Sequence, residues 1–373
     1  MLKSFKSYLI ATLAIFVLLQ SVVCFADFPS GFFPTLTSGD LYYGQDMSVS
    51  SADIQQKIMR SVANDEARLA STMTQTEPYY VLIENETITV VYDIGSKSEL
   101  FGVVMSRCGA NNIFDYSEFF TVNKVDKLDR TLISQKNFRR TSVTDTHSPY
   151  VVQALYNIDG DRPASFAFTG GNHSYDEAYN KGNRTGSTQS ISFMVDGAEV
   201  QYYDGYATRV DIIYENHVQA SNTAKMFTEG RNVIREMDHI VFDGEKWKSS
   251  INVVAFEPVE IYRYYGLQFD TREFGDKVMY VYNDGRISLY DAKDASVSTD
   301  KTCNIINVFG DKFDVEISIT SDFGTNNDTD HSAFNENYKK TYFNIVNTTY
   351  NSLHLEQGSG FNLEGYYKFT SSK

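Results

Sequence analysis

The chain has 373 residues, of which 48 are acidic and 33 are basic, and its net charge is −15. This charge repels the phosphates of nucleic acids, and no basic cluster larger than Arg139-Arg140 offsets it locally, which argues against a nucleic-acid partner. Neutral sugars, cationic peptides and divalent ions all remain compatible with such a chain.

The first 26 residues have the organisation of a secretory leader. Lys3 and Lys6 precede an apolar run over residues 8–23, and a small residue, Ala26, closes it. The run is shorter than the ~20 apolar residues of a typical spanning helix, and Gln20 interrupts it, so cleavage is favoured over a retained anchor. The sequence predicts a signal peptide over 1–26, no membrane span after cleavage, and a secreted protein, or a periplasmic one in a Gram-negative host.

One α-helix is predicted, over about residues 52–73. Ser50 precedes Asp53 by three residues and is a suitable cap. The apolar residues that recur at helical spacing are Ile54, Ile58, Val62, Leu69 and Met73.

From residue 79 onward, short runs rich in β-branched and aromatic residues alternate with turn signals. The clearest runs cover 79–83, 87–93, 191–195, 210–218, 233–242, 247–256 and 278–282. Four Asp-Gly pairs favour tight hairpin turns: Asp159-Gly160, Asp196-Gly197, Asp243-Gly244 and Asp284-Gly285. The predicted fold class is therefore all-β, a mainly antiparallel β-sandwich or supersandwich with one N-terminal helix.

The polar stretch 139–148 is the predicted boundary between an N-terminal segment, 27–148, and a main antiparallel β domain, 149–373. A single integrated body is the alternative. Cys108 and Cys303 are the two cysteines left after leader cleavage. In an oxidising compartment a disulfide between them is the simplest prediction, and two free thiols are the alternative.

A polar cluster follows two glycines at residues 170 and 171. An unperturbed histidine titrates near neutral pH, and His173 has carboxylates close by in the sequence, which suits acid–base chemistry. The element Asn172-His173-Ser174-Tyr175 resembles the Asn-His-Thr/Ser-Tyr element of aldose 1-epimerases. That resemblance implies a β-supersandwich in which His173 acts as an acid on a sugar ring oxygen.

Alternation along two strands provides a second candidate site. Asp211, Glu215 and His217 share one face of the strand over 210–218, and Arg235 and His239 share one face of the strand over 233–242. If the strands are neighbours, these side chains line one polar groove. The alternative is a solvated outer sheet face with ordinary cross-strand pairs.

Tyrosines cluster at 202–206 and at 262–265. Exposed aromatic rings beside polar groups can stack on sugars, whereas tyrosines within strands often pack in the core. The predicted ligand-binding residues are Asn172, Tyr175, Tyr203, Tyr206, Arg235 and Tyr264.

No cofactor or metal site is predicted. The six histidines show no close pairing, the cysteines form no CxxC motif, and no P-loop or GxGxxG motif is present. The oxygen-rich stretch 326–330 lacks the glycine and distal glutamate of an EF-hand loop. Asn85, Asn172, Asn183, Asn327 and Asn347 begin sequons that would accept glycans in a eukaryotic secretory host.

Three functions follow as hypotheses. The first is a secreted, non-catalytic protein that binds carbohydrate or another cell-surface ligand. The second is a carbohydrate-active enzyme, whose candidate catalytic residues are His173, Glu215, His217 and Glu236. The third is a structural or adhesive surface component of undetermined oligomeric state. Fold alone does not separate them, because function depends on the site.

Overall fold

The computed structural model of the chain describes most of the residues after 77. The described residues are 78–141, 149–158, 160, 167–174, 183–225, 229–271, 275–282, 285, 287–291, 297–298, 303–319, 333–335, 340–343, 345–346 and 352–372. The predicted leader, the predicted helix over 52–73, Tyr175 and the 326–330 stretch lie outside them.

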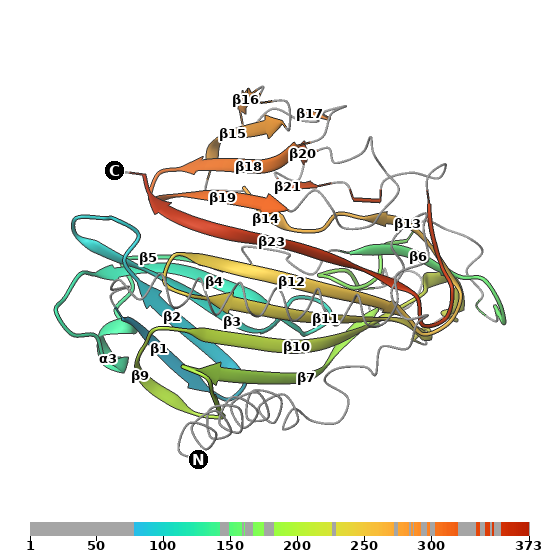
Figure 1. Ribbon diagram of the computed structural model, residues 1–373, viewed down its shortest axis with the longest axis horizontal. Helices are drawn as coiled ribbons and strands as arrows, with labels where there is room; N and C mark the ends of the chain where they lie inside the picture. Colours follow the sequence, from blue (N-terminus) through green and yellow to red (C-terminus); the bar gives the residue numbers. More distant parts are fainter. Residues whose placement is uncertain are drawn as a thin grey trace, which may run out of the picture.

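The described part of the chain is an antiparallel β structure, which confirms the predicted fold class. Its largest unit is a ten-stranded sheet in the order β16-β15-β18-β19-β23-β12-β11-β10-β7-β8, which spans the molecule in Figure 1. These strands are β7 Gly186–Val195, β8 Ala198–Val200, β10 Val210–Gln219, β11 Asn232–Phe242, β12 Lys246–Ala255, β15 Gly275–Tyr282, β16 Ile287–Asp291, β18 Cys303–Gly310, β19 Phe313–Ile319 and β23 Gly360–Ser371.

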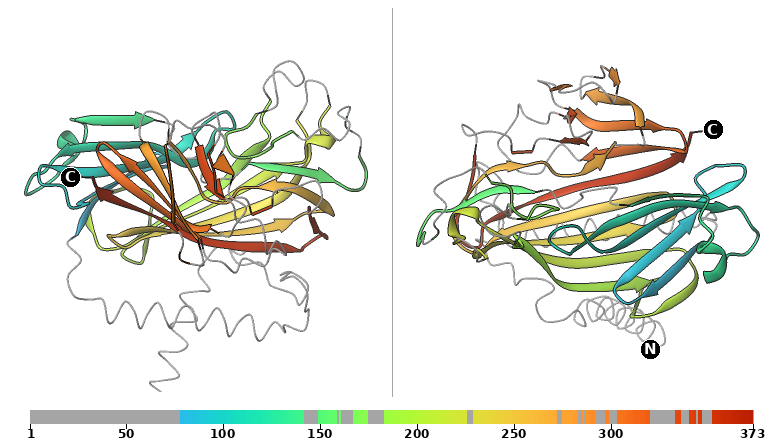
Figure 2. Two further views of the ribbon diagram at one scale, coloured as in Figure 1. Left: turned by 90° about the horizontal axis from the view of Figure 1, so that it is seen from above. Right: turned by 180° about the vertical axis from the view of Figure 1, so that it is seen from behind.

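A six-stranded sheet in the order β5-β4-β3-β2-β1-β9 packs against one face of the ten-stranded sheet, over β10–β12 (Figures 1 and 2). Its strands are β1 Tyr79–Glu84, β2 Thr87–Tyr92, β3 Glu99–Cys108, β4 Ile113–Asn123, β5 Phe138–Thr141 and β9 Tyr203–Ala207; the short helix α3, Arg130–Ile133, precedes β5. Since β1 pairs with β9, this sheet combines strands from both sides of the predicted boundary. Arg139 and Arg140 lie within β5.

Two smaller sheets complete the described fold. The first, in the order β22-β13-β6, consists of β6 Tyr150–Ala154, β13 Val259–Tyr264 and β22 Leu353–Leu355. The second, in the order β14-β21-β20-β17, consists of β14 Gln268–Asp270, β17 Val297–Ser298, β20 Ala333–Asn335 and β21 Lys340–Phe343. A 3₁₀ turn, η1 Ser221–Thr223, follows β10.

Aromatic side chains join the two large sheets. Trp247 on β12 is fully buried and donates its indole N–H to the hydroxyl of Tyr92 on β2, with an N–O distance of 3.0 Å. Its ring stacks on Phe242 at 4.7 Å. Phe101 on β3 likewise contacts Phe369 on β23 at 4.8 Å between ring centroids. Large buried rings contribute strongly to a core, so the interface between the sheets is the main hydrophobic core.

Residues with positive φ form the tight turns between several paired strands. Asp196 and Gly197 both have positive φ, 48° and 83°, and they connect β7 to β8. Asn85 and Glu86 also have positive φ and connect β1 to β2. A two-residue turn of this kind matches the twist of the flanking strands. The Asp243-Gly244 pair connects β11 to β12, whereas Asp159 and Asp284 lie outside the described residues.

The two cysteines are not joined by a disulfide, which corrects the simpler of the two sequence predictions. Cys108 ends β3 in the six-stranded sheet, and Cys303 begins β18 in the ten-stranded sheet. The Cys303 thiol instead donates to the carbonyl of Ile305 at 3.2 Å. Sequence spacing alone could not show that the two residues belong to different sheets.

We expect Cys303 to resist alkylation in the native protein. Burial raises the pKa of its thiol to about 11, and the thiolate is the reactive form. Iodoacetamide at pH 8, followed by mass spectrometry, should label Cys303 only after unfolding, whereas the less buried Cys108 should react first. A Cys108→Ser variant serves as the control. Labelling of either cysteine only after reduction would contradict this arrangement.

Candidate functional site

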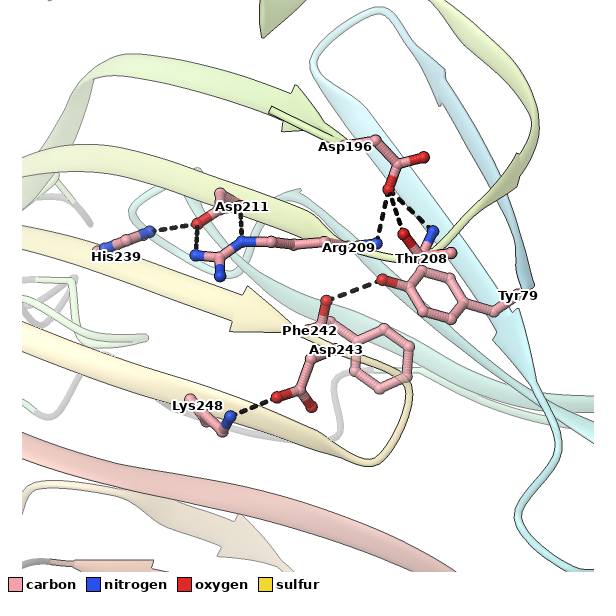
Figure 3. Close-up of polar contacts among 9 residues, drawn as sticks. All are labelled: Tyr79, Asp196, Thr208, Arg209, Asp211, His239, Phe242, Asp243 and Lys248. Carbon is pink, nitrogen blue, oxygen red and sulfur yellow. Dashed lines mark hydrogen bonds and ion pairs between the residues drawn. The ribbon is translucent and has the colours of Figure 1, made fainter. Parts of the chain in front are cut away.

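The two strands of the predicted polar groove are neighbours. β10 and β11 pair antiparallel, with His217 opposite Arg235 and Ile213 opposite His239. Asp211, Glu215 and His217 therefore share a sheet face with Arg235 and His239, which we call the polar face. Figure 3 shows the end of this face around Asp211.

Asp211 is the most strongly held group of the polar face. Its buried carboxylate accepts two hydrogen bonds from Arg209, both of 2.7 Å, and contacts Nε2 of His239 at 2.9 Å (Figure 3). Burial acts to raise its pKa, but the hydrogen bonds and charges of Arg209 and His239 prevail, and the pKa falls to about 2. Asp211 is therefore ionised at neutral pH and holds both basic side chains in place.

The segment before β10 positions Arg209 through its backbone. The Asp196 carboxylate accepts hydrogen bonds from the backbone N–H groups of Thr208 and Arg209 and from the Thr208 hydroxyl, each of 2.9 Å (Figure 3). Tyr79 of β1 donates to the carbonyl of Phe242, which joins the six-stranded sheet to the end of β11. The Asp211 contacts therefore lie on a well-supported part of the fold.

A second histidine–carboxylate pair lies further along β10. Nε2 of His217 is 2.6 Å from Glu215 Oε1, and the imidazole meets the ring of Phe256 edge-on at 4.9 Å. Opposite His217, Nε of Arg235 is buried and has no hydrogen-bond partner within the described part of the chain. This end of the face combines acceptors, donors and one partly exposed aromatic ring.

Glu236 does not belong to the polar face. It is 1% exposed, and its position opposite Asn216 turns its side chain toward the interior, whereas Glu215 faces outward. The hydroxyl of Tyr150 donates to Glu236 Oε2. Glu215 and Glu236 therefore lie on opposite faces of one sheet and cannot serve the same reacting group.

His173 lies in the turn that follows Thr169, and Gly170 of this turn lies against Val218 near the end of β10. Its backbone carbonyl accepts from Asn111 Nδ2 at 2.8 Å, and its ring is 5.1 Å from the ring of Phe168. The side-chain carbonyl of Asn172 accepts from the backbone N–H of Ala110 at 2.7 Å. These described contacts hold the turn against the loop between β3 and β4, and none of them includes Glu215, His217 or Glu236.

The structure separates the two tyrosine clusters. Tyr264 is fully buried and stacks on Tyr150 at 4.7 Å, so the prediction that it contacts an external ligand is corrected: its ring is part of the core. Tyr202, by contrast, is 60% exposed, and Tyr206 is 37% exposed. Tyr203 is partly buried and donates to the carbonyl of Tyr206 at 2.7 Å.

Arg130 and acidic residues surround the exposed tyrosines. The guanidinium carbon of Arg130 is 6.0 Å from the centre of the Tyr202 ring. Its Nη2 donates to Glu84 at 2.9 Å, and its Nε is 3.7 Å from Asp204. We call Tyr202, Tyr206, Arg130, Asp204 and Glu84 the tyrosine edge, because β9 is an edge strand of the six-stranded sheet.

His354 on β22 has two glutamate partners. His354 bridges Glu260 at 3.2 Å and Glu356 at 3.1 Å, and its hydrogen bonds to Glu356 and Glu260 raise its pKa.

No group of three or more His, Cys, Asp and Glu side chains that could hold a metal occurs among the described residues. The helices in the part of the chain that the structure describes are too short or too polar to cross a membrane.

The sequence did not predict Arg209 of the polar face or Arg130 of the tyrosine edge. Arg209 lies outside the strand that was predicted, and Arg130 is 72 residues from Tyr202 along the chain. Only the Asp-X-X-Leu cap at Asp129, whose side chain accepts from the backbone N–H of Leu132, gave a local signal that a helix would begin beside Arg130.

No family model matches this chain, and no curated protein matches it. Among solved structures it is similar to the galactosidase domain of the alpha-galactosidase-sucrose kinase AgaSK, with 8% identity over 78% of this chain and 42% of that chain and a TM-score of 0.43. It is also similar to the GH36 alpha-galactosidase AgaB of Geobacillus stearothermophilus, with 7% identity over 78% and 41% and a TM-score of 0.44.

A third similar structure is the Slr1438 protein of Synechocystis sp. PCC 6803, with 11% identity over 80% of this chain and 97% of that one and a TM-score of 0.33. This chain spans about two fifths of the length of the alpha-galactosidases it resembles. At TM-scores below 0.5, none of these likenesses supports a conclusion about activity, which has to come from the sites themselves.

Proposed function

We propose that this protein is a secreted, non-catalytic carbohydrate-binding protein and that the tyrosine edge is its binding surface. The observation that carries the proposal is the exposed ring of Tyr202, which lies beside Arg130 and two carboxylates at the edge of a rigid sheet. A flat aromatic ring can stack on the apolar face of a sugar, while charged side chains around it hydrogen-bond the hydroxyls.

The side chains of the tyrosine edge are held before a ligand arrives. Tyr80 donates to Asp204, and the Tyr206 hydroxyl accepts from the backbone N–H of Leu128 at 2.6 Å. Arg130 has five N–H donors and faces acidic partners on β1 and β9. Such pre-ordering lowers the conformational entropy that the protein loses on binding, which favours affinity.

The acidic chain also fits this class of ligand better than a polyanion. A net charge of −15 repels acidic polysaccharides and nucleic acids at long range but has no such effect on a neutral sugar. A neutral glycan is therefore the ligand class that we propose.

Glycan-array screening of the full chain, followed by calorimetry on any hit, tests the proposal. Tyr202→Ala should weaken binding by about 5- to 30-fold, since an aromatic contact contributes roughly 1–2 kcal/mol. Tyr156→Ala is the matched control, because Tyr156 is 61% exposed and lies in the loop that follows β6. Equal loss in both variants, or no glycan bound by the wild type, would refute the proposal.

A further inference from the structure

One end of the polar face carries an arginine without an anionic partner. Arg235 on β11 makes no hydrogen bond or ion pair within the described part of the chain, although the protein has 48 acidic and 33 basic residues. Other arginines of the chain each have a carboxylate at 3.4 Å or less, namely Arg107, Arg130, Arg139, Arg140, Arg209 and Arg231. Arg235 is therefore a positive charge that the described chain does not neutralise.

Two rings meet over β11 beside Arg235. His217 on β10 and Val254 on β12 lie directly opposite Arg235 in the sheet register. Phe256 follows β12, and its backbone N–H donates to the carbonyl of Val233 at 2.8 Å, which holds it beside the start of β11. The rings of His217 and Phe256 are edge-on at 4.9 Å. Since these two residues come from strands on opposite sides of β11, their rings meet over β11, next to Arg235.

The guanidinium of Arg235 has a covered edge and an open edge. Its Nε is buried and unpartnered within the described residues, whereas its two Nη atoms are not among the buried, unpartnered atoms and the side chain is partly exposed. Native proteins rarely leave a buried donor unpaired, so this position needs an explanation. The open Nη edge presents N–H donors in a rigid fork. Arg235 is therefore held with this fork accessible to a ligand.

The acidic groups near Arg235 already have basic partners. Glu215 Oε1 is 2.6 Å from Nε2 of His217, and Glu257 accepts two hydrogen bonds from Arg231, at 2.5 and 2.9 Å. The remaining neighbours on this part of the face are apolar side chains that solvent reaches, namely Met237, Val254 and Phe256. The surface thus combines one unneutralised cation with an apolar contact area.

These features select the class of ligand. A guanidinium fork matches the two oxygens of a carboxylate, and such charge-assisted pairs are stronger than neutral hydrogen bonds. One unneutralised positive charge fits a monoanion, and the ring of Phe256, which is 36% exposed, fits an apolar group next to it. The net charge of −15 weakens such binding little, because salt screens charges beyond about 8 Å at physiological ionic strength.

We propose that Arg235, His217 and Phe256 form a binding site for a small organic monocarboxylate with an apolar part. The carboxylate would accept from the Nη groups of Arg235, and the apolar part would lie on the ring of Phe256. His217, which is paired with Glu215, positions that ring. This site lies on the ten-stranded sheet, whereas the tyrosine edge belongs to the six-stranded sheet, so it does not depend on carbohydrate binding.

Titration with benzoate, followed by saturation-transfer NMR, tests this site, and benzamide is the neutral probe of the same shape. The full chain should bind benzoate saturably, with a dissociation constant on the order of 1 mM, which is typical of so small a ligand. Benzamide should bind about tenfold more weakly or worse, because it lacks the charge that the fork recognises. Absence of saturable benzoate binding, or equal binding of benzamide, would overturn the proposal.

The variant Arg235→Gln should weaken benzoate binding by about tenfold or more, since it removes both the charge and the fork. Arg235→Lys keeps the charge but loses the fork, so it should also bind more weakly than the wild type. Phe256→Ala should weaken binding by about fivefold through the lost apolar contact. Arg139→Gln, which removes the same charge from an exposed position on β5, is the matched control and should bind as the wild type does.

Circular dichroism verifies that each variant folds. If Arg235→Gln does not fold, Arg235→Lys and the comparison of benzoate with benzamide on the wild type still decide. Wild-type affinity in any folded variant of Arg235 or Phe256, or an equal loss in Arg139→Gln, would contradict a site built on these side chains.

Discussion

Replacing Tyr264 with alanine is expected to lower the free energy of unfolding by about 3–5 kcal/mol, the usual cost of removing a large buried ring. Tyr264 is fully buried, stacks on Tyr150 at 4.7 Å and meets Phe361 edge-on at 5.3 Å. The backbone of its strand also pairs with β6, so the lost ring leaves a cavity that a rigid sheet fills poorly. Chemical denaturation followed by tryptophan fluorescence measures the change.

Tyr202→Ala is the control for this prediction, because the same residue type is removed from an exposed position. Its stability should stay within about 0.5 kcal/mol of the wild type. Tyr264→Phe keeps the ring and should retain most of the stability. If Tyr264→Ala instead kept its stability and lost only ligand binding, the assignment of Tyr264 to the core would be wrong.

Asp211→Asn is expected to destabilise the protein by about 2–3 kcal/mol at neutral pH. The carboxylate of Asp211 holds Arg209 and His239, and the lowering of its pKa from 3.8 to about 2 corresponds to that amount of stability. Because the pKa is lower in the folded state, this stability is present above about pH 4 and disappears as the pH falls through 2.

Urea denaturation of the wild type and of Asp211→Asn between pH 2 and pH 7 tests this prediction. The difference in stability between the two proteins should be largest at neutral pH and should vanish near pH 2. Glu199→Gln, at an exposed position on β8 at the edge of the same sheet, should follow the wild-type profile. A pH profile of Asp211→Asn parallel to that of the wild type would rule out Asp211 as the source of this acid sensitivity.

Local pattern predicted much of the fold and part of the polar face. The alternation along β10 placed Asp211, Glu215 and His217 on one side, since side chains of a strand point alternately to opposite faces. The positive-φ turn at Asp196-Gly197 was likewise readable, because few residue pairs tolerate that geometry. These features depend on residues within a few positions of one another.

The composition of each site could not be predicted in the same way. Tyr202 meets Arg130, and Tyr150 donates to Glu236, only because segments far apart in the sequence come together. The same alternation that grouped Glu215 with His217 also turned Glu236 away from them, which the enzyme hypothesis had not taken into account. The spacing of residues along the chain does not indicate which sheet packs against which face of the ten-stranded sheet.

The sequence by itself determined the β class, the hairpin turns and the two faces of the central strands, because periodicity and turn chemistry are local properties of the chain. The tertiary structure decided which tyrosines are core and which are surface, which partners hold Asp211, and that Glu236 and Asp238 face a covered interior. The physical reason is that burial and charge pairing depend on contacts between distant segments, such as β1 with β9, and these are fixed only when the sheets pack together.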